Sequence, residues 1–161
     1  MGFEEIAHTA DWALHVWADN LEGLFAEAAH GMNALSGANL VEGPKVKRSF
    51  EAESPDAESL LVAFLSELVY YAEKENLAFD HYNVQTACPA CASAALAWPP
   101  GQAGTGEHGE GFKQLNVRTL KVEMEGGKIV SLNKTIKAVT YHNLQIRQTA
   151  RGYEVEIVFD V

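Results

Sequence analysis

The chain has 161 residues, with 12 Lys or Arg against 22 Asp or Glu, and its formal net charge is −10 at pH 7. This acidity argues against direct binding of nucleic acid, because phosphate contacts need clustered basic side chains. No apolar run has the length of a membrane span and the start of the chain lacks a signal pattern, so we expect a cytoplasmic protein with a single domain.

The first part of the chain predicts a strand followed by an amphipathic helix. Residues 6–18 alternate between apolar and polar side chains, as in a half-buried strand. Asp19 is expected to cap the next helix, with Glu22 three residues later as in a capping box. Apolar residues then recur at helical spacing, and Gly37 is expected to end the helix.

A second strand and helix follow. The strand is expected over residues 45–54, and Ser54 is expected to cap the helix, with Pro55 in its first position. A wide apolar stripe predicts that this helix continues to about Asn76. Another strand is expected over residues 78–86.

Residues 88–113 are rich in Ala, Gly and Pro, which predicts a surface loop inserted into the domain. The only two cysteines, Cys88 and Cys91, lie in it at C-x-x-C spacing. Such a pair can form half of a zinc site, with His81 or His108 as a nitrogen donor, or a redox pair. A variable loop with two thiols or a local disulfide is the simpler interpretation, because an isolated C-x-x-C is a weak signal.

The last part of the chain predicts strands. We expect a bulge or break near residues 118–119, a hairpin turn at Gly126-Gly127, and one long strand or two over residues 129–146. Because helices come early and strands run together late, the sequence predicts an α+β fold. We expect one domain over residues 1–161, with a mostly antiparallel or mixed sheet packed against two amphipathic helices.

The chain ends on a strand with alternating apolar residues, Tyr153, Val155, Ile157, Phe159 and Val161. The terminal carboxylate therefore stands beside the side chain of Asp160. Hard divalent cations prefer oxygen donors of this kind. Taken alone, the pattern is most simply a strand with an acidic end.

Three short motifs give this acidic end more weight. They are His8-Thr9-Ala10-Asp11, then Lys137-Ala138-Val139-Thr140-Tyr141-His142, and finally Phe159-Asp160-Val161. In combination they resemble the archease family, over nearly the whole chain outside the inserted loop. The resemblance implies a non-enzymatic protein that assists an RtcB-type RNA ligase in tRNA splicing and RNA repair. Such proteins promote guanylylation and turnover of the ligase.

The family also implies a site for a divalent cation, usually described as calcium. The matching positions are Asp11, Asp160 and the terminal Val161. His8 is a candidate neighbour of the metal, or a structural histidine. Trp12 departs from the aliphatic residue usual after the first Asp, which could alter access to the metal.

The middle motif supplies candidates for partner contact. Lys137 and Tyr141 share one parity of the expected strand, whereas His142 shares the other with Leu144 and Ile146, so we expect His142 to be buried.

Two other functions remain open. One is a metal-dependent hydrolase that uses Asp11 and Asp160 to hold its cation, although the sequence offers no clear general base. The other is a general chaperone, which would need an exposed apolar surface. The sequence contains no phosphate-binding loop, no H-E-x-x-H and no nucleophile elbow.

Overall fold

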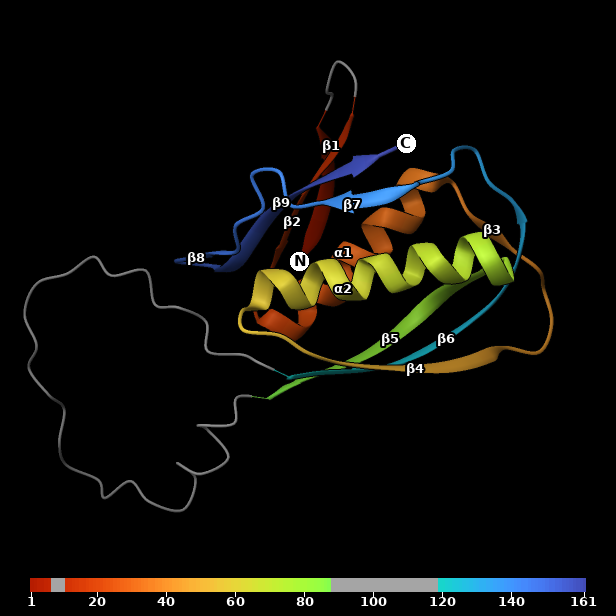
Figure 1. The fold of residues 1–161 in the computed structure, drawn as a ribbon, viewed down its shortest axis with the longest axis horizontal. Coiled ribbons are helices and arrows are strands. Elements are labelled where there is room, and N and C mark those ends of the chain that lie inside the picture. The colour runs from red at the N-terminus through yellow and green to blue at the C-terminus, as the bar shows by residue number, and fades with distance from the viewer. Residues whose placement is uncertain (7–10, 88–118) are drawn as a thin grey trace, which may run out of the picture.

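Two antiparallel β-sheets enclose two helices in the computed structural model, which describes residues 1–6, 11–87 and 119–161 (Figure 1). Helix α1 (Leu21–Ser36) contacts strands of both sheets, and so does helix α2 (Ala57–Tyr70). The prediction of an α+β fold is confirmed, with the difference that the helices lie between two sheets. None of the described helices is long and apolar enough to cross a membrane.

The five-stranded sheet joins the beginning and the end of the chain. Its order is β1-β2-β9-β7, and β8 also pairs with β9. Its strands are β1 (Gly2–Ile6), β2 (Trp12–Ala18), β7 (Ala138–Thr140), β8 (Arg147–Thr149) and β9 (Gly152–Asp160). The expected strand over residues 6–18 is therefore too long at its start, and β1 is a separate strand that pairs antiparallel with β2. Strand β9 follows the predicted alternation and lies in the interior of the sheet.

The four-stranded sheet is organised around β6 (Thr119–Ser131). The strands that pair with β6 are β3 (Asn39–Leu40), β4 (Val46–Glu53) and β5 (Leu77–Ala87). Strand β6 runs straight through Gly126 and Gly127, so the expected hairpin turn is wrong. A Cβ on Gly126 would stand 2.0 Å from the backbone oxygen of Ala78, so Gly126 permits close approach of β5 where that strand has a register irregularity.

Both helices begin one or two residues later than expected. The Asn20 side chain caps α1 by accepting a hydrogen bond from the Gly23 N–H at 2.6 Å, so Asp19 is not the cap. Asp56 caps α2 in the same way, accepting from the Ser59 N–H at 2.7 Å, so Ser54 is not the cap. In each case the capping residue has an extended backbone and a short side chain with an oxygen acceptor.

The predicted helix ends are confirmed. Gly37 closes α1 with a left-handed φ of 62°. Helix α2 continues into a π-helical turn (Tyr71–Glu75), which ends at Asn76 with a φ of 52°.

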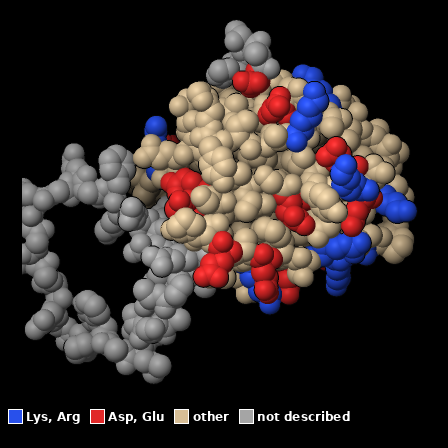
Figure 2. Space-filling model, viewed as in Figure 1, with Lys and Arg blue, Asp and Glu red and all other residues tan. Residues whose placement is uncertain are grey.

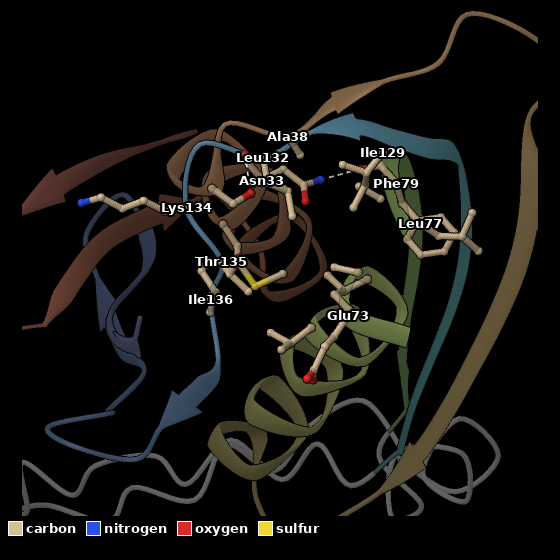
Figure 3. Close-up of a pocket in the computed structure, with 16 residues that line it drawn as sticks. Asn33, Ala38, Glu73, Leu77, Phe79, Ile129, Leu132, Lys134, Thr135 and Ile136 are labelled. Carbon is tan, nitrogen blue, oxygen red and sulfur yellow. Dashed lines mark hydrogen bonds between the residues drawn. The ribbon is translucent and has the colours of Figure 1, made fainter. Parts of the chain in front are cut away.

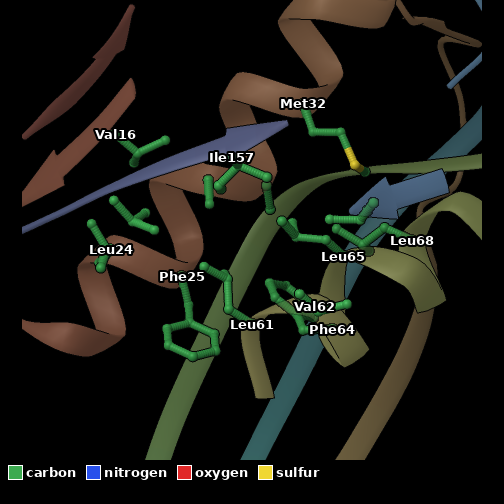
Figure 4. Close-up of a cluster of buried hydrophobic side chains, with 14 of the residues drawn as sticks. Val16, Leu24, Phe25, Met32, Leu61, Val62, Phe64, Leu65, Leu68 and Ile157 are labelled. Carbon is green, nitrogen blue, oxygen red and sulfur yellow. The ribbon is translucent and has the colours of Figure 1, made fainter. Parts of the chain in front are cut away.

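A single apolar core fills the space between the sheets and the helices (Figure 4). Phe25 of α1 stacks on Phe64 of α2 with ring centroids 6.3 Å apart, and both side chains are fully buried. Ile157 of β9 and Leu65 of α2 lie in the same cluster. Burial of this core holds the two sheets at fixed positions, so the ends of their strands form a rigid frame for any site.

Candidate functional site

The register of β2 and β9 brings two of the predicted metal residues to the same place. Trp12 is the partner of Phe159 in this antiparallel pair. Asp11 immediately precedes Trp12, and Asp160 immediately follows Phe159, so both carboxylates stand at the same end of two adjacent strands. Asp11 is half-buried, and Asp160 is exposed.

Strand β7 holds the backbone of Asp160 on the edge of β9 that faces away from β2. Ala138 is its register partner, and the Lys137 N–H donates a hydrogen bond to the Asp160 carbonyl oxygen at 2.8 Å. Asp160 is therefore held by backbone pairing with β7 and by its position next to Phe159, which pairs with β2, so its side chain extends from an ordered strand. Lys137 is exposed next to this strand end.

Trp12 takes part in a contact at the same end. The Lys134 ammonium group lies 3.4 Å from the centroid of the Trp12 ring, a cation–π contact. This contact ties the segment before β7 to the start of β2. A positive charge is thereby placed on the residue that adjoins Asp11.

The side chains described here do not by themselves form a complete cage for a metal. Within residues 1–6, 11–87 and 119–161, no three His, Cys, Asp or Glu residues cluster closely enough to hold an ion. Calcium takes six to eight oxygen ligands, which include carboxylates, backbone carbonyls and waters. The donor set of Asp11, Asp160 and the Val161 carboxylate has the right chemistry, and water or a partner would complete it.

The other residues of the middle motif lie apart from this end. Strand β7 ends at Thr140, and a turn follows in which the Leu144 N–H donates to the Tyr141 carbonyl oxygen at 3.1 Å. Tyr141 and His142 are both exposed, so the expected burial of His142 is wrong. The parity argument fails because the turn, in which Asn143 has a φ of 53°, interrupts the strand repeat.

The remaining candidates cannot be placed in the site. His8, Cys88 and Cys91 lie outside the described residues, as does His108. His81 is exposed on β5.

A small cavity between the helices and the four-stranded sheet does not suit a substrate (Figure 3). Its volume is about 40 Å³, far below the several hundred Å³ usual for ligand pockets. Its lining is mostly apolar, and the Lys134 side chain points away from it. The Asn33 amide at its edge donates to the Phe79 carbonyl oxygen at 2.6 Å, so this polar group serves the fold.

The clearest changes in pKa also concern the fold. Burial raises the pKa of the Tyr82 hydroxyl above its usual value, and this hydroxyl donates to the Phe79 carbonyl oxygen at 2.7 Å. Partial burial acts to raise the pKa of Asp80, but the hydrogen bond and charge of Lys45 lower it overall. Neither residue is near Asp160 in the sheet arrangement, so neither suggests acid–base chemistry at the candidate site.

Sequence reasoning missed one polar groove. It has a volume of about 510 Å³ and is lined by residues of β2, β9 and the connection between β7 and β8, among them His15, Tyr141, Glu154 and Glu156. Only the exposed tyrosine belongs to a motif singled out in the sequence. The groove depends on how β2 meets residues 141–156 from the other end of the sequence, which no local pattern predicts.

Comparison with known proteins gives consistent results. The model of the Archease protein family (MTH1598/TM1083) matches residues 3–161. Protein archease of Methanosarcina barkeri is 30% identical over 160 residues, which cover 99% of this chain and 95% of that protein. Protein archease of Methanopyrus kandleri is 29% identical over the full length of both chains.

Two solved structures share the fold. The solution structure of Methanobacterium thermoautotrophicum protein 1598 has a TM-score of 0.62 at 19% identity, covering 99% of both chains. The crystal structure of a Thermotoga maritima archease, described as a possible chaperone, has a TM-score of 0.61 at 19% identity, covering 98% of this chain and 96% of that one.

Proposed function

Because this chain belongs to the archease family, we propose that it is a non-enzymatic activator of an RtcB-type RNA ligase in tRNA splicing or RNA repair. We further propose that it binds a divalent cation, most simply Ca²⁺, through Asp11, Asp160 and the carboxylate of Val161. The pairing of Trp12 with Phe159 is the observation that carries this proposal, since it sets the two aspartates at one end of the sheet.

The charge of the protein supports contact with a ligase in preference to contact with RNA. The net charge is −10, and Figure 2 shows Asp and Glu spread over one face, with Lys and Arg mainly towards its right-hand end and in no continuous patch. An acidic surface complements a basic partner, such as a protein whose own function is to bind RNA. In this proposal the protein reaches the RNA only through its partner.

A general chaperone is the weaker alternative. Such a protein needs a contiguous apolar patch to hold unfolded chains. The exposed large apolar side chains of the described residues are scattered over several elements: Met1, Phe3, Trp17, Val41, Tyr70, Val130 and Tyr141. Of these, Phe3 and Trp17 are each less than half exposed.

A ligation assay under multiple turnover tests the proposed function. Addition of this protein to a purified RtcB-type ligase with GTP and a cleaved RNA should increase the number of turnovers. Asp160→Ala should remove the effect, whereas Glu123→Ala, an exposed carboxylate on the other sheet, should keep it. Equal activity of the ligase with and without the protein would contradict the proposal. Hydrolysis of RNA or nucleotide by the protein alone would favour the hydrolase alternative.

A further inference from the structure

The five-stranded sheet has a gap along one edge of β9. Strand β7 pairs with β9 from Asp160 to Val158, and β8 pairs with it from Glu154 to Gly152. Between them, residues 155–157 of β9 have no strand partner on that side in the described part of the chain. Figure 1 shows the connection between β7 and β8 leaving the edge of β9 and returning to it.

The chain that spans the gap is anchored away from β9. The Ile146 N–H donates a hydrogen bond to the Glu58 Oε1 atom at 3.2 Å, which ties this connection to the first turn of α2. Ile146 is buried, and Leu144 packs partly against the core. The anchoring explains why the connection does not close onto β9, and it gives the polar groove a fixed wall.

The backbone of β9 is oriented for a ligand in this gap. The carbonyl oxygen of Val158 accepts from the Thr140 hydroxyl at 3.0 Å, and that of Asp160 accepts from the Lys137 N–H at 2.8 Å. Both carbonyls therefore face the side of β7. Because backbone groups repeat every two residues along a strand, the Glu156 carbonyl and N–H face the same side, which is the open gap.

The two glutamates that line the groove, Glu154 and Glu156, differ in their charged neighbours. His15 Nε2 lies 3.4 Å from Glu154 Oε2, and Arg147 is the register partner of Glu154 on β8. Glu154 is thus accompanied by two basic side chains. Glu156 forms no ion pair with any described residue. Its register partner on β2 is His15, and the register partner of His15 on β1 is Glu4.

Polar and aromatic side chains form the opposite wall. Tyr141 is 61% exposed and lines the groove together with Asn143 and Gln145. An exposed tyrosine ring and an available carboxylate that line the same groove match the guanidinium group, which stacks on aromatic faces and pairs with carboxylates through two hydrogen bonds. The amides add hydrogen-bonding capacity for an extended backbone.

We propose that this groove binds an extended peptide segment of a protein partner, with one arginine side chain placed between Tyr141 and Glu156. The backbone of the segment pairs with the N–H and carbonyl of Glu156 in the gap between β7 and β8, which is a short form of recognition by strand addition. The site is separate from the carboxylates at the other end of β9. It depends neither on a bound cation nor on the assignment to a ligase.

Fluorescence anisotropy with a defined probe tests this inference. The probe is an end-capped, fluorescein-labelled heptapeptide of Val and Thr with one central Arg, and its control carries citrulline at that position. We expect the Arg peptide to bind and the citrulline peptide to bind at least threefold more weakly, which is the scale of an exposed charge pair. Glu156→Gln should weaken the Arg peptide by roughly fivefold, and Tyr141→Ala by roughly threefold.

Matched variants separate this site from the rest of the molecule. Glu123→Gln changes an exposed carboxylate on the four-stranded sheet and should leave the affinity unchanged. Asp160→Ala should also leave it unchanged, whereas Glu156→Gln should retain any response to Ca²⁺. Shifts of the Val155 and Glu156 amide resonances on titration with the Arg peptide would support the strand pairing.

Several results would overturn the inference. They are no binding of the Arg peptide, equal affinity for the citrulline peptide, an equal loss in Glu123→Gln, or saturable binding of a single-stranded RNA that is lost in Tyr141→Ala. Because Tyr141 and Glu156 are not core residues, an unchanged amide spectrum outside the groove would confirm that each variant is folded.

Discussion

Trp12 and Phe159 are direct partners across β2 and β9, and through this pairing the start of β2 and the end of β9 lie at the same end of the sheet. The Phe159 side chain is fully buried, so packing in the core holds the register of β2 and β9 at this pair. Asp11 precedes Trp12 and Asp160 follows Phe159, so this pairing also brings the two aspartates close together. Any effect of a cation on the protein should therefore depend on these two carboxylates.

Divalent cations should stabilise the folded protein. In the proposed site the ionised carboxylates of Asp11, Asp160 and Val161 would repel one another, and a bound cation would remove that repulsion. Melting curves with and without Ca²⁺ should show a higher melting temperature in its presence for the wild type. Asp160→Ala should abolish the increase, and Glu123→Ala should retain it. Equal increases in all three proteins would remove Asp160 from the site.

The position of a purification tag should also matter. If the carboxylate of Val161 is a ligand, residues fused after it convert that carboxylate into a peptide bond, and calorimetry should show weaker Ca²⁺ binding. The same tag placed before Met1 should leave the affinity unchanged. The fold should tolerate both tags, because Val161 lies beyond the last residue of β9. Identical affinities for the two tagged proteins would contradict a role for the terminal carboxylate.

Residues 88–118 should be replaceable by a short turn. Ala87 and Thr119 are register partners at the ends of β5 and β6, so four Gly and Ser residues can connect them as a hairpin. Loop closure costs only about 0.6 kcal/mol for each doubling of length, so the stability should change little. The shortened protein should keep its response to Ca²⁺.

A structural zinc site at Cys88 and Cys91 would give the opposite result. Its loss should cost several kcal/mol or unfold the domain. Stoichiometric zinc in the purified protein, lost together with stability in Cys88→Ser/Cys91→Ser, would show that the segment does more than connect two strands.

Two adjacent glycines of β6 should respond differently to alanine. A Cβ at Gly126 would overlap the backbone oxygen of Ala78 at 2.0 Å, whereas at Gly127 the nearest atom is 3.5 Å away. Gly126→Ala should therefore lower the free energy of unfolding by about 2–3 kcal/mol, as overpacking does. Gly127→Ala should be neutral or slightly stabilising. Urea denaturation measures both, and a neutral Gly126→Ala would show that β5 can move aside.

The Lys45–Asp80 ion pair should contribute a small, pH-dependent stability. The interaction with Lys45 lowers the folded-state pKa of Asp80, so its contribution is present above the unfolded value of about 3.9 and is lost as the pH falls through the lower folded value. Both side chains are more than 40% exposed, so screening limits the contribution at pH 7 to less than about 1 kcal/mol. Asp80→Asn and Lys45→Met should each lose the contribution of this ion pair to the free energy of unfolding. In acid, the free energies of unfolding of both variants should approach that of the wild type.

Local signals predicted the helices better than the connections between strands. The apolar stripes and Gly37 located α1 and α2, because core burial and a left-handed cap leave clear patterns. Asp19 and Asn20 are both good capping residues, and only the path of the chain selects the second. Strand β1 escaped notice because its sequence, Gly-Phe-Glu-Glu-Ile, has little alternation at the edge of the sheet.

Non-local contacts account for the remaining errors. Gly126-Gly127 has the composition of a turn, but Gly126 is required by the close approach of β5. His142 was assigned to a buried face on the assumption of a continuous strand, which the turn at Asn143 interrupts. The proximity of Asp11 and Asp160 was expected only through family resemblance, because the pairing of β2 with β9 leaves no local trace. Metal binding by these residues stays a prediction.

The pairing of β2 with β9 also has a consequence for how the protein folds. This sheet requires contact between residues near the start of the chain and residues near its end, with both helices and the entire second sheet between them in sequence. Contacts of such long range make folding slow, because a large loop must close before the contacts can stabilise it. The second sheet and α2 need only residues 39–131 and can form earlier. We therefore expect a late step in which the two ends of the chain meet, and the acidic strand end would be complete only after that step.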